Sequence, residues 1–214
     1  MRSVIAGILA LAALVFLILE AARLVDVDFL VYLGAADALM SGQDLYNNFN
    51  VGGLPFTYPP FAGAVFIPFD LFPPTAAFAI WTAVSIAALA GIAWLTAMRL
   101  PALVGKELTT KTWELALFIF AIGAFSETVI KNIELGQVNL VLVLLIMFDT
   151  VTKAHYRGFL TGMAAGFKIV PAIFIVFMLV NRRWGDFGRA LLGFLTTLAI
   201  GSFFGIGQVW QFFS

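Results

Sequence analysis

The residues best suited to chemistry lie in the longest polar segment of the chain, residues 25–60. This segment has no lysine or arginine and carries four acids: Asp26, Asp28, Asp37 and Asp44. A carboxylate with few cations nearby can stay ionised and accept a proton from a hydroxyl nucleophile, which is general-base chemistry. Asp28 is the strongest candidate for this role, with capping of the next helix as its alternative. Asp26 is a weaker candidate, because a solvated loop acid explains it better.

Two further polar features could serve the same site. The first is the Tyr-Pro-Pro sequence that begins at Tyr58, in which consecutive prolines fix the backbone and aim the residue before them. A purely structural turn is the alternative. The second is residues 131–139, which carry Glu134, Gln137 and Asn139. Amide groups hydrogen-bond sugar hydroxyls and phosphate oxygens, but they also cap helices, and both interpretations stay open.

Lys168 is a cation within a long apolar segment, with no other charged residue between Arg157 and Arg182. A cation near mid-membrane costs at least about 2.5–3.5 kcal/mol on insertion scales and needs a partner. That partner would be a buried acid or an anionic ligand. The alternative is a lysine that extends from a helix end to the membrane surface.

The composition predicts an integral membrane protein. Hydrophobic residues make up 62% of the chain and charged residues 11%, with a mean hydropathy of +1.03. Soluble domains have about 45–50% apolar and about 25% charged residues. A net charge of zero with scattered basic residues argues against a nucleic-acid partner. The chain has no cysteine and a single His155, so we expect no metal site built from these ligands and no cofactor.

The apolar segments predict the membrane helices that position these residues. Residues 4–22 form a run of the ~20 residues that a spanning helix needs, and we expect the N-terminus to be cytoplasmic. Residues 75–98 form a second span. The basic residues Arg99, Lys106 and Lys111 follow it and mark the cytoplasmic side. Residues 25–74 are therefore expected to form an outer active-site loop.

Within this outer loop we expect two short interfacial helices. Apolar residues recur at three- and four-residue spacing over residues 29–40, with Asp28 at the N-cap position and Gly42 as a stop. This pattern predicts an amphipathic helix at the membrane surface. The run 61–69 is too short to span and lies between prolines, so it predicts a second such helix.

The second half of the chain is expected to cross the membrane less regularly. Residues 113–128 lead outward, residues 131–139 are polar and residues 140–152 return. Residues 158–180 are long enough to span, but the arginines that follow them would then lie outside.

Pro171 breaks a helix, because it lacks a donor and clashes with the carbonyl four residues back. A broken re-entrant helix pair around Lys168 and Pro171 satisfies both the length and the charge rule. Residues 191–206 would then cross outward, and residues 1–214 would form a single transmembrane domain.

Four segments in this order resemble glycosyltransferase family 87. They are DFLVYLGAADALMSGQDLY, FTYPPFAGAVFIPF, ELGQVNLVLVLLIMF and GFLTGMAAGFKIVPAIFIVFMLVNRRW. Each segment alone is weakly specific, but the four segments in this order are fairly specific for the family. The resemblance covers about residues 25–184 and implies an all-α membrane bundle of the GT-C type. Family members run to about twice this length, so we expect this chain to be an amino-terminal portion.

The resemblance also implies a reaction and roles for residues. Such enzymes transfer a sugar, most often mannose, from a polyprenyl phosphate to a lipid or glycan hydroxyl on the outer face of a prokaryotic plasma membrane, with inversion. Asp28 would be the base, and Tyr32 and Tyr58 would shape the pocket. Gln137 and Asn139 would lie near donor or acceptor. Together with Asp26 and Glu134, these residues form the expected substrate site.

Lys168 would stabilise the phosphate leaving group, because phosphate departure develops negative charge. The sequence leaves two other functions open. In a transporter, Asp28 and Lys168 would line a substrate path; in an inactive fragment or scaffold, they would have no chemical role. An inverted repeat would favour the transporter.

Overall fold

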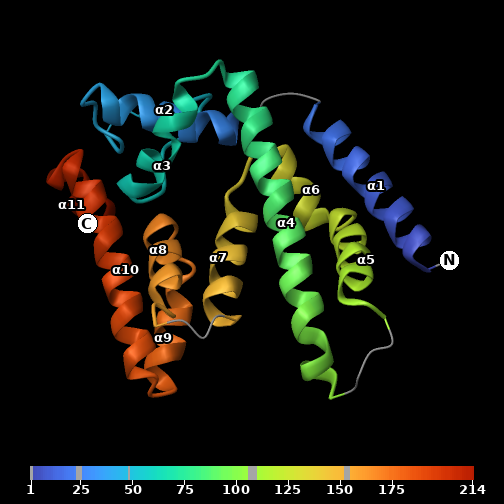
Figure 1. Cartoon of the computed structure of the whole chain (residues 1–214). Helices are drawn as coiled ribbons and strands as arrows, with labels where there is room; N and C mark the ends of the chain where they lie inside the picture. Colours follow the sequence, from blue (N-terminus) through green and yellow to red (C-terminus); the bar gives the residue numbers. More distant parts are fainter. Residues whose placement is uncertain (1, 23–25, 48, 106–109, 152–154) are drawn as a thin grey trace. The chain divides into compact units, whose positions relative to one another are not determined.

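The computed structural model describes residues 2–22, 26–47, 49–105, 110–151 and 155–214, and its regular elements in this part of the chain are all α-helices joined by turns and loops (Figure 1). The helices in this part of the chain are α1 Arg2–Ala21, α2 Val27–Met40, α3 Pro60–Asp70, α4 Pro74–Val104, α5 Thr112–Ala124, α6 Glu127–Glu134, α7 Asn139–Val151, α8 Phe159–Phe167, α9 Ala172–Val180, α10 Trp184–Phe203 and α11 Ile206–Phe213. Several predicted positions, among them Val25, Lys106 and Lys153, lie outside the described residues.

Two helices confirm that this is a membrane protein. α1 and α4 are long and apolar enough to cross a membrane. α5 and α6 together are long enough for a third span, but they meet at an angle of 72°. The predicted spans 4–22 and 75–98 therefore correspond to α1 and α4.

The chain forms two compact units. One comprises Met1–Asp26 and Phe78–Met147, and the other comprises Val27–Ala77 and Phe148–Ser214. Each unit thus joins segments that are far apart in the sequence. The single transmembrane domain predicted from the sequence stays a prediction.

The first unit is held by small and aliphatic side chains from α1, α4, α5, α6 and α7. Its buried core consists of Ala10, Ala13, Leu17, Ala88, Leu89, Ala93, Phe120, Ala121, Ala124, Val129, Ile133 and Leu140. The segment 131–139, expected to be a polar stretch between two helices, is helical as far as Glu134. The Ser126 hydroxyl caps this helix, α6, and Val129 and Ile133 bury one side of it.

The second unit is built on α8 and α10, which run parallel and very close together. Three glycines of this region each lie against a residue of α10. Gly158 lies against Asp186, Gly162 against Ala190 and Gly166 against Thr197. A Cβ atom added to Gly162 would lie 2.8 Å from the carbonyl carbon of Ala190. Small residues that allow backbones to approach in this way are typical of membrane helix interfaces.

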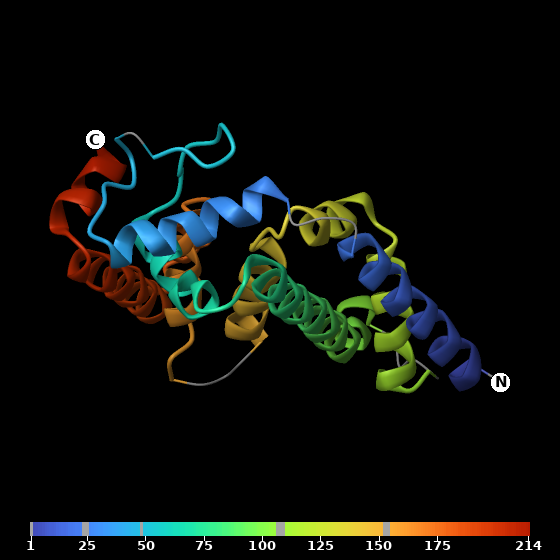
Figure 2. The ribbon, with the colours of Figure 1, turned by 90° about the horizontal axis from the view of Figure 1, so that it is seen from above.

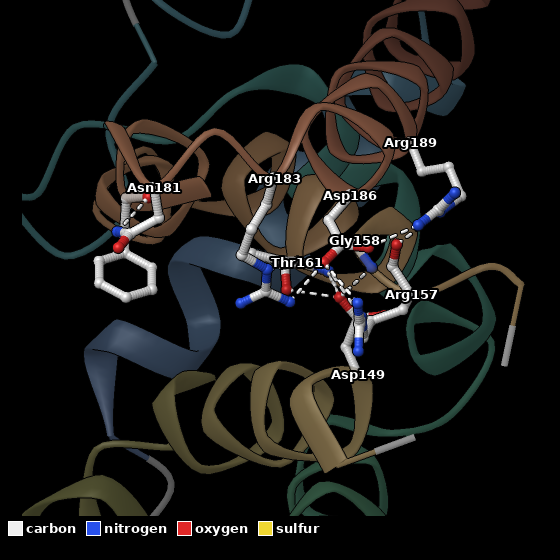
Figure 3. Close-up of polar contacts among 9 residues, drawn as sticks. Asp149, Arg157, Gly158, Thr161, Asn181, Arg183, Asp186 and Arg189 are labelled. Carbon is white, nitrogen blue, oxygen red and sulfur yellow. Dashed lines mark hydrogen bonds and ion pairs between the residues drawn. The ribbon is translucent and has the colours of Figure 1, made fainter. Parts of the chain in front are cut away.

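The broken helix pair is confirmed. α8 ends at Phe167, and α9 begins at Ala172, after Lys168 and Pro171. The two ends of this hairpin lie next to each other, because Arg157 before α8 and Arg183 after α9 contact the same carboxylate, that of Asp186 (Figure 3). Lys168 therefore lies at the tip of the hairpin, at the far end of α8 from the arginines.

The helices α2, α3 and α11 cover the tip end of α8 and α10 (Figures 1 and 2). α2 begins at Val27, so the prediction that Asp28 occupies the N-cap was wrong by two positions: Asp28 lies inside the first turn. α2 is also buried on more sides than an amphipathic surface helix would be, because α3 and the adjoining loop pack around it. Met40, expected on its buried face, is 64% exposed.

Two boundaries near the end of the chain differ from expectation. α10 begins at Trp184 rather than at residue 191, because Asp186 is neutralised by arginines and can enter the helix. α11 was not expected from the sequence. Gly205, at φ 140°, turns the chain back, and Gln208 of α11 then bonds the loop that follows α2.

We predict that Gly162→Ala lowers the stability of the protein, since the added methyl group must push α8 away from α10. Overpacking of this kind costs about 1–3 kcal/mol of unfolding free energy. Thermal unfolding in detergent would measure the change. The matched control is Gly188→Ala, where nothing lies within 4 Å of the added atom. The control should be neutral or slightly stabilising, and equal losses in both variants would contradict close packing as the cause.

Candidate functional site

An aromatic cluster around Tyr32 brings together three of the sequence motifs. The Tyr32 ring stacks on Phe66 of α3, with centroids 4.7 Å apart, and on Tyr58 of the Tyr-Pro-Pro turn, at 5.0 Å. Phe167, the last residue of α8, lies at 6.4 Å. Tyr32 itself is fully buried. The rings thus hold α2, the turn and the hairpin tip against one another.

Charged groups flank this cluster on two sides. The Lys168 ammonium group lies 5.4 Å from the centre of the Tyr58 ring, a cation–π contact. Asp28 lies one helical turn before Tyr32 on the same side of α2. Burial, followed by Tyr58 and then the charge of Asp28, raises the pKa of the Tyr32 hydroxyl. Tyr32 therefore stays protonated between an acid and a second tyrosine.

A folded loop positions Tyr58. The Tyr46 hydroxyl donates a hydrogen bond of 2.8 Å to the carbonyl oxygen of Tyr58. Tyr46 is fixed in turn by Asp44, whose carboxylate accepts from the backbone amides of Tyr46 and Asn47, both at 2.8 Å. Hydrogen bonds from these two amides, Asn47 first, lower the pKa of Asp44 to about 2. Asp44 is thus a structural residue among the four loop acids.

α11 holds the same loop from the other side (Figure 2). Gln208 accepts from the amide of Leu45 at 3.1 Å and donates to the carbonyl of Gln43 at 3.2 Å. Gln211 donates to the Asp44 carboxylate at 3.1 Å. These supporting residues were missed because glutamines on a short helix carry no local signal of a contact about 165 residues away.

The other sequence-predicted residues belong to the first unit. Glu134 is half-buried and forms an ion pair of 2.6 Å with Lys131. The backbone of Gln137 exchanges hydrogen bonds with Asn132. Asn139 is exposed at the start of α7, and Asp26 precedes α2. The structure therefore groups Asp28, Tyr32, Tyr58 and Lys168 in one unit and the remaining four candidates in the other.

The grouped residues can perform acid–base and electrostatic chemistry. Asp28 offers a carboxylate that can accept a proton, Lys168 offers a fixed positive charge, and the partly buried Tyr58 ring offers an aromatic surface beside them. Within the described residues, no group of three or more acids or histidines is arranged to hold a metal ion.

The helices, the apolar spans and this site define a helical membrane protein with a polar site beside α2. Comparison with known proteins identifies its family: residues 56–214 match the model of glycosyltransferase family 87. The chain belongs to that family. Asp28 and Tyr32 precede the matched residues. No solved structure matches the chain.

The chain is similar to curated mannosyltransferases of mycobacteria. A polyprenol-phosphate-mannose-dependent alpha-(1-2)-phosphatidylinositol pentamannoside mannosyltransferase of Mycolicibacterium smegmatis is 34% identical over 92% of this chain and 47% of its own length. A polyprenol-phosphate-mannose-dependent alpha-(1-2)-phosphatidylinositol mannoside mannosyltransferase of Mycobacterium tuberculosis is 30% identical over 87% of this chain and 46% of its own length. The chain spans about half the length of these relatives.

The depressed pKa of Asp44 predicts how the loop responds to acid. A carboxyl group with a folded-state pKa of about 2, against 3.8 ordinarily, stabilises the fold above pH 3.8 and loses this effect as the pH falls towards 2. The unfolding temperature of wild type should exceed that of Asp44→Asn by a constant amount above about pH 4. The difference should shrink below that pH. A difference unchanged down to pH 2 would show that the charge of Asp44 is not what matters.

Proposed function

We propose that this protein takes part in transferring a sugar, mannose by its resemblance, from a polyprenyl-phosphate donor to a hydroxyl group of a lipid or glycan acceptor. The acceptor and the site would lie on the outer face of the plasma membrane. The curated relatives act with polyprenol-phosphate-mannose on phosphatidylinositol mannosides. The observation that carries the proposal is the grouping of Asp28, Tyr32, Tyr58 and Lys168 from three separate motifs.

The proposed step is a single displacement. The acceptor oxygen forms a bond to the anomeric carbon of the sugar as the bond from that carbon to the phosphate oxygen breaks. Asp28 takes the proton of the acceptor hydroxyl, and the polyprenyl phosphate leaves with the electron pair. One displacement inverts the configuration at the anomeric carbon. No covalent intermediate with the protein is needed.

Lys168 would stabilise the departing phosphate. Negative charge grows on the phosphate oxygens as the bond breaks, and a cation already in place stabilises that charge without reorganising. Lys168 is held at the hairpin tip by the helix break and by the Tyr58 ring. Tyr58, which is only partly buried, would help to shape the pocket, and the fully buried Tyr32 would hold Tyr58 in place by stacking.

The arrangement of charges in the second unit supports the proposed orientation. Arginines gather where α8 and α10 begin, whereas Asp28 and the acidic loop lie where these two helices end. α10 alone is about 30 Å long, close to the thickness of the hydrocarbon core. Basic residues favour the cytoplasmic side, which would put the acidic loop on the outer face.

Replacing Asp28 by Asn should reduce transfer by about 10²- to 10⁴-fold, because the amide cannot accept the proton. The assay would follow radiolabel from polyprenyl-phosphate mannose into membrane acceptors. Asp37→Asn is the matched control, since Asp37 is an exposed acid on the same helix. Equal transfer by wild type and Asp28→Asn would remove Asp28 from the mechanism. Absence of transfer by wild type would contradict the proposed function of this chain.

Replacing Lys168 by Gln should lower the rate of transfer by about 10²- to 10³-fold, the effect of removing one preorganised charge-stabilising group. Lys168→Arg keeps the positive charge and should recover part of the rate. The rate at saturating donor should fall more than the donor affinity. Equal losses in the Gln and Arg variants would indicate that the shape of the hairpin tip, not its charge, is what matters.

A further inference from the structure

We infer that the arginine-rich end of α8 and α10 is a binding site for the phosphate group of an anionic phospholipid. This site is separate from the proposed transferase site, lies at the other end of α8, and does not depend on it. Its side chains are Arg157, Arg183 and Arg189, which surround Asp186 (Figure 3).

The three arginines of this cluster are held in place by Asp186 and by one another. The carboxylate of Asp186 is 4% exposed and accepts from all three guanidinium groups. Arg189 contacts one of its oxygens at 2.5 Å, and Arg157 contacts the other at 2.9 Å. Arg189 also donates to the carbonyl oxygen of Arg157 at 2.7 Å. The guanidinium groups are therefore fixed before any ligand arrives.

The arginine cluster carries an excess of positive charge. Three guanidinium groups converge on one buried carboxylate, and the nearby Asp149 is fully buried. Asp149 bonds the Gly158 amide at 2.8 Å and the Thr161 hydroxyl at 2.6 Å (Figure 3). Three arginines against two acids leave one excess positive charge, and the exposed Arg182 adds a second. This excess favours an anion at the surface of the cluster.

The guanidinium groups of the cluster remain accessible to a ligand. The side chains of Arg157, Arg183 and Arg189 are 38%, 30% and 36% exposed. Each guanidinium group carries five N–H donors, and Asp186 has only two oxygens to accept them. Planar N–H groups in this fixed arrangement match the oxygens of a phosphate group.

The exposed apolar surface next to the arginines favours a phospholipid over a soluble phosphate. Trp184, at the start of α10, is 62% exposed, as expected of a residue at a membrane surface. An exposed apolar stripe continues along α10 through Leu191, Leu192 and Leu195. From Trp184 to Leu195 the helix rises about 16 Å, roughly half of a ~30 Å hydrocarbon core. A lipid with its phosphate at the arginines would lay its acyl chains along this stripe.

The test is a comparison of lipid binding by native mass spectrometry of the detergent-purified chain. Dioleoylphosphatidylglycerol should bind in preference to dioleoylphosphatidylcholine. Arg157→Gln and Arg189→Gln should each reduce this preference by about fivefold, the effect of one arginine near an anionic lipid. Arg2→Gln, an exposed arginine of α1 in the other unit, is the matched control and should leave the preference unchanged.

Further measurements keep the inference testable if a variant fails to fold. Arg189→Lys retains the charge but loses the planar N–H donors, and should keep part of the preference. In the wild type, inorganic phosphate at millimolar concentration should not displace phosphatidylglycerol. Equal binding of the two lipids by wild type, an equal effect of Arg2→Gln, or displacement by inorganic phosphate would each overturn the assignment of a phospholipid site.

Discussion

The close approach of α8 to α10 is the constraint on which the second unit depends. Glycines at 158, 162 and 166 remove the side chains that would separate the two backbones, and Gly193 does the same from the α10 side. With little room for side chains between them, the helices fix the direction of the hairpin. The hairpin tip, and Lys168 with it, is therefore carried to a defined place beside α2 and the Tyr-Pro-Pro turn.

Each end of this helix pair has a different kind of interaction. At one end, ion pairs join Arg157, Arg183 and Arg189 through Asp186 and tie the two arms of the hairpin together. At the other end, the stacked rings of Tyr32, Tyr58 and Phe66 hold α2, the Tyr-Pro-Pro turn and α3 together. Ion pairs with half-exposed arginines suit a membrane surface, whereas stacked aromatic rings exclude water around a buried tyrosine. The asymmetry fits a protein whose two faces meet different surroundings.

Support for the site comes from outside the motifs that contain it. Tyr58 is oriented by Tyr46, Tyr46 by Asp44, and this loop by glutamines of α11. Such supporting contacts determine how precisely a functional side chain is held. They also explain why Asp28 and Asp44, two acids of one polar segment, differ in role. Asp44 uses its oxygens to fix the backbone, whereas Asp28 lies beside the tyrosines.

The sequence by itself determined the class of protein, the two long spans, the helix break at Lys168 and Pro171, and the family. The class, the spans and the helix break depend on composition, apolar run length and proline chemistry, which act locally along the chain. The family followed instead from the resemblance of four segments to glycosyltransferase family 87. Local patterns could not predict that α6 extends to Glu134, that Asp186 lies inside α10, or that α11 forms and holds the loop. Only the tertiary structure decided these, because each requires a partner distant in sequence. For the same reason, the tertiary structure alone brought Tyr58 against Tyr32 and Lys168 and gathered three arginines around one acid.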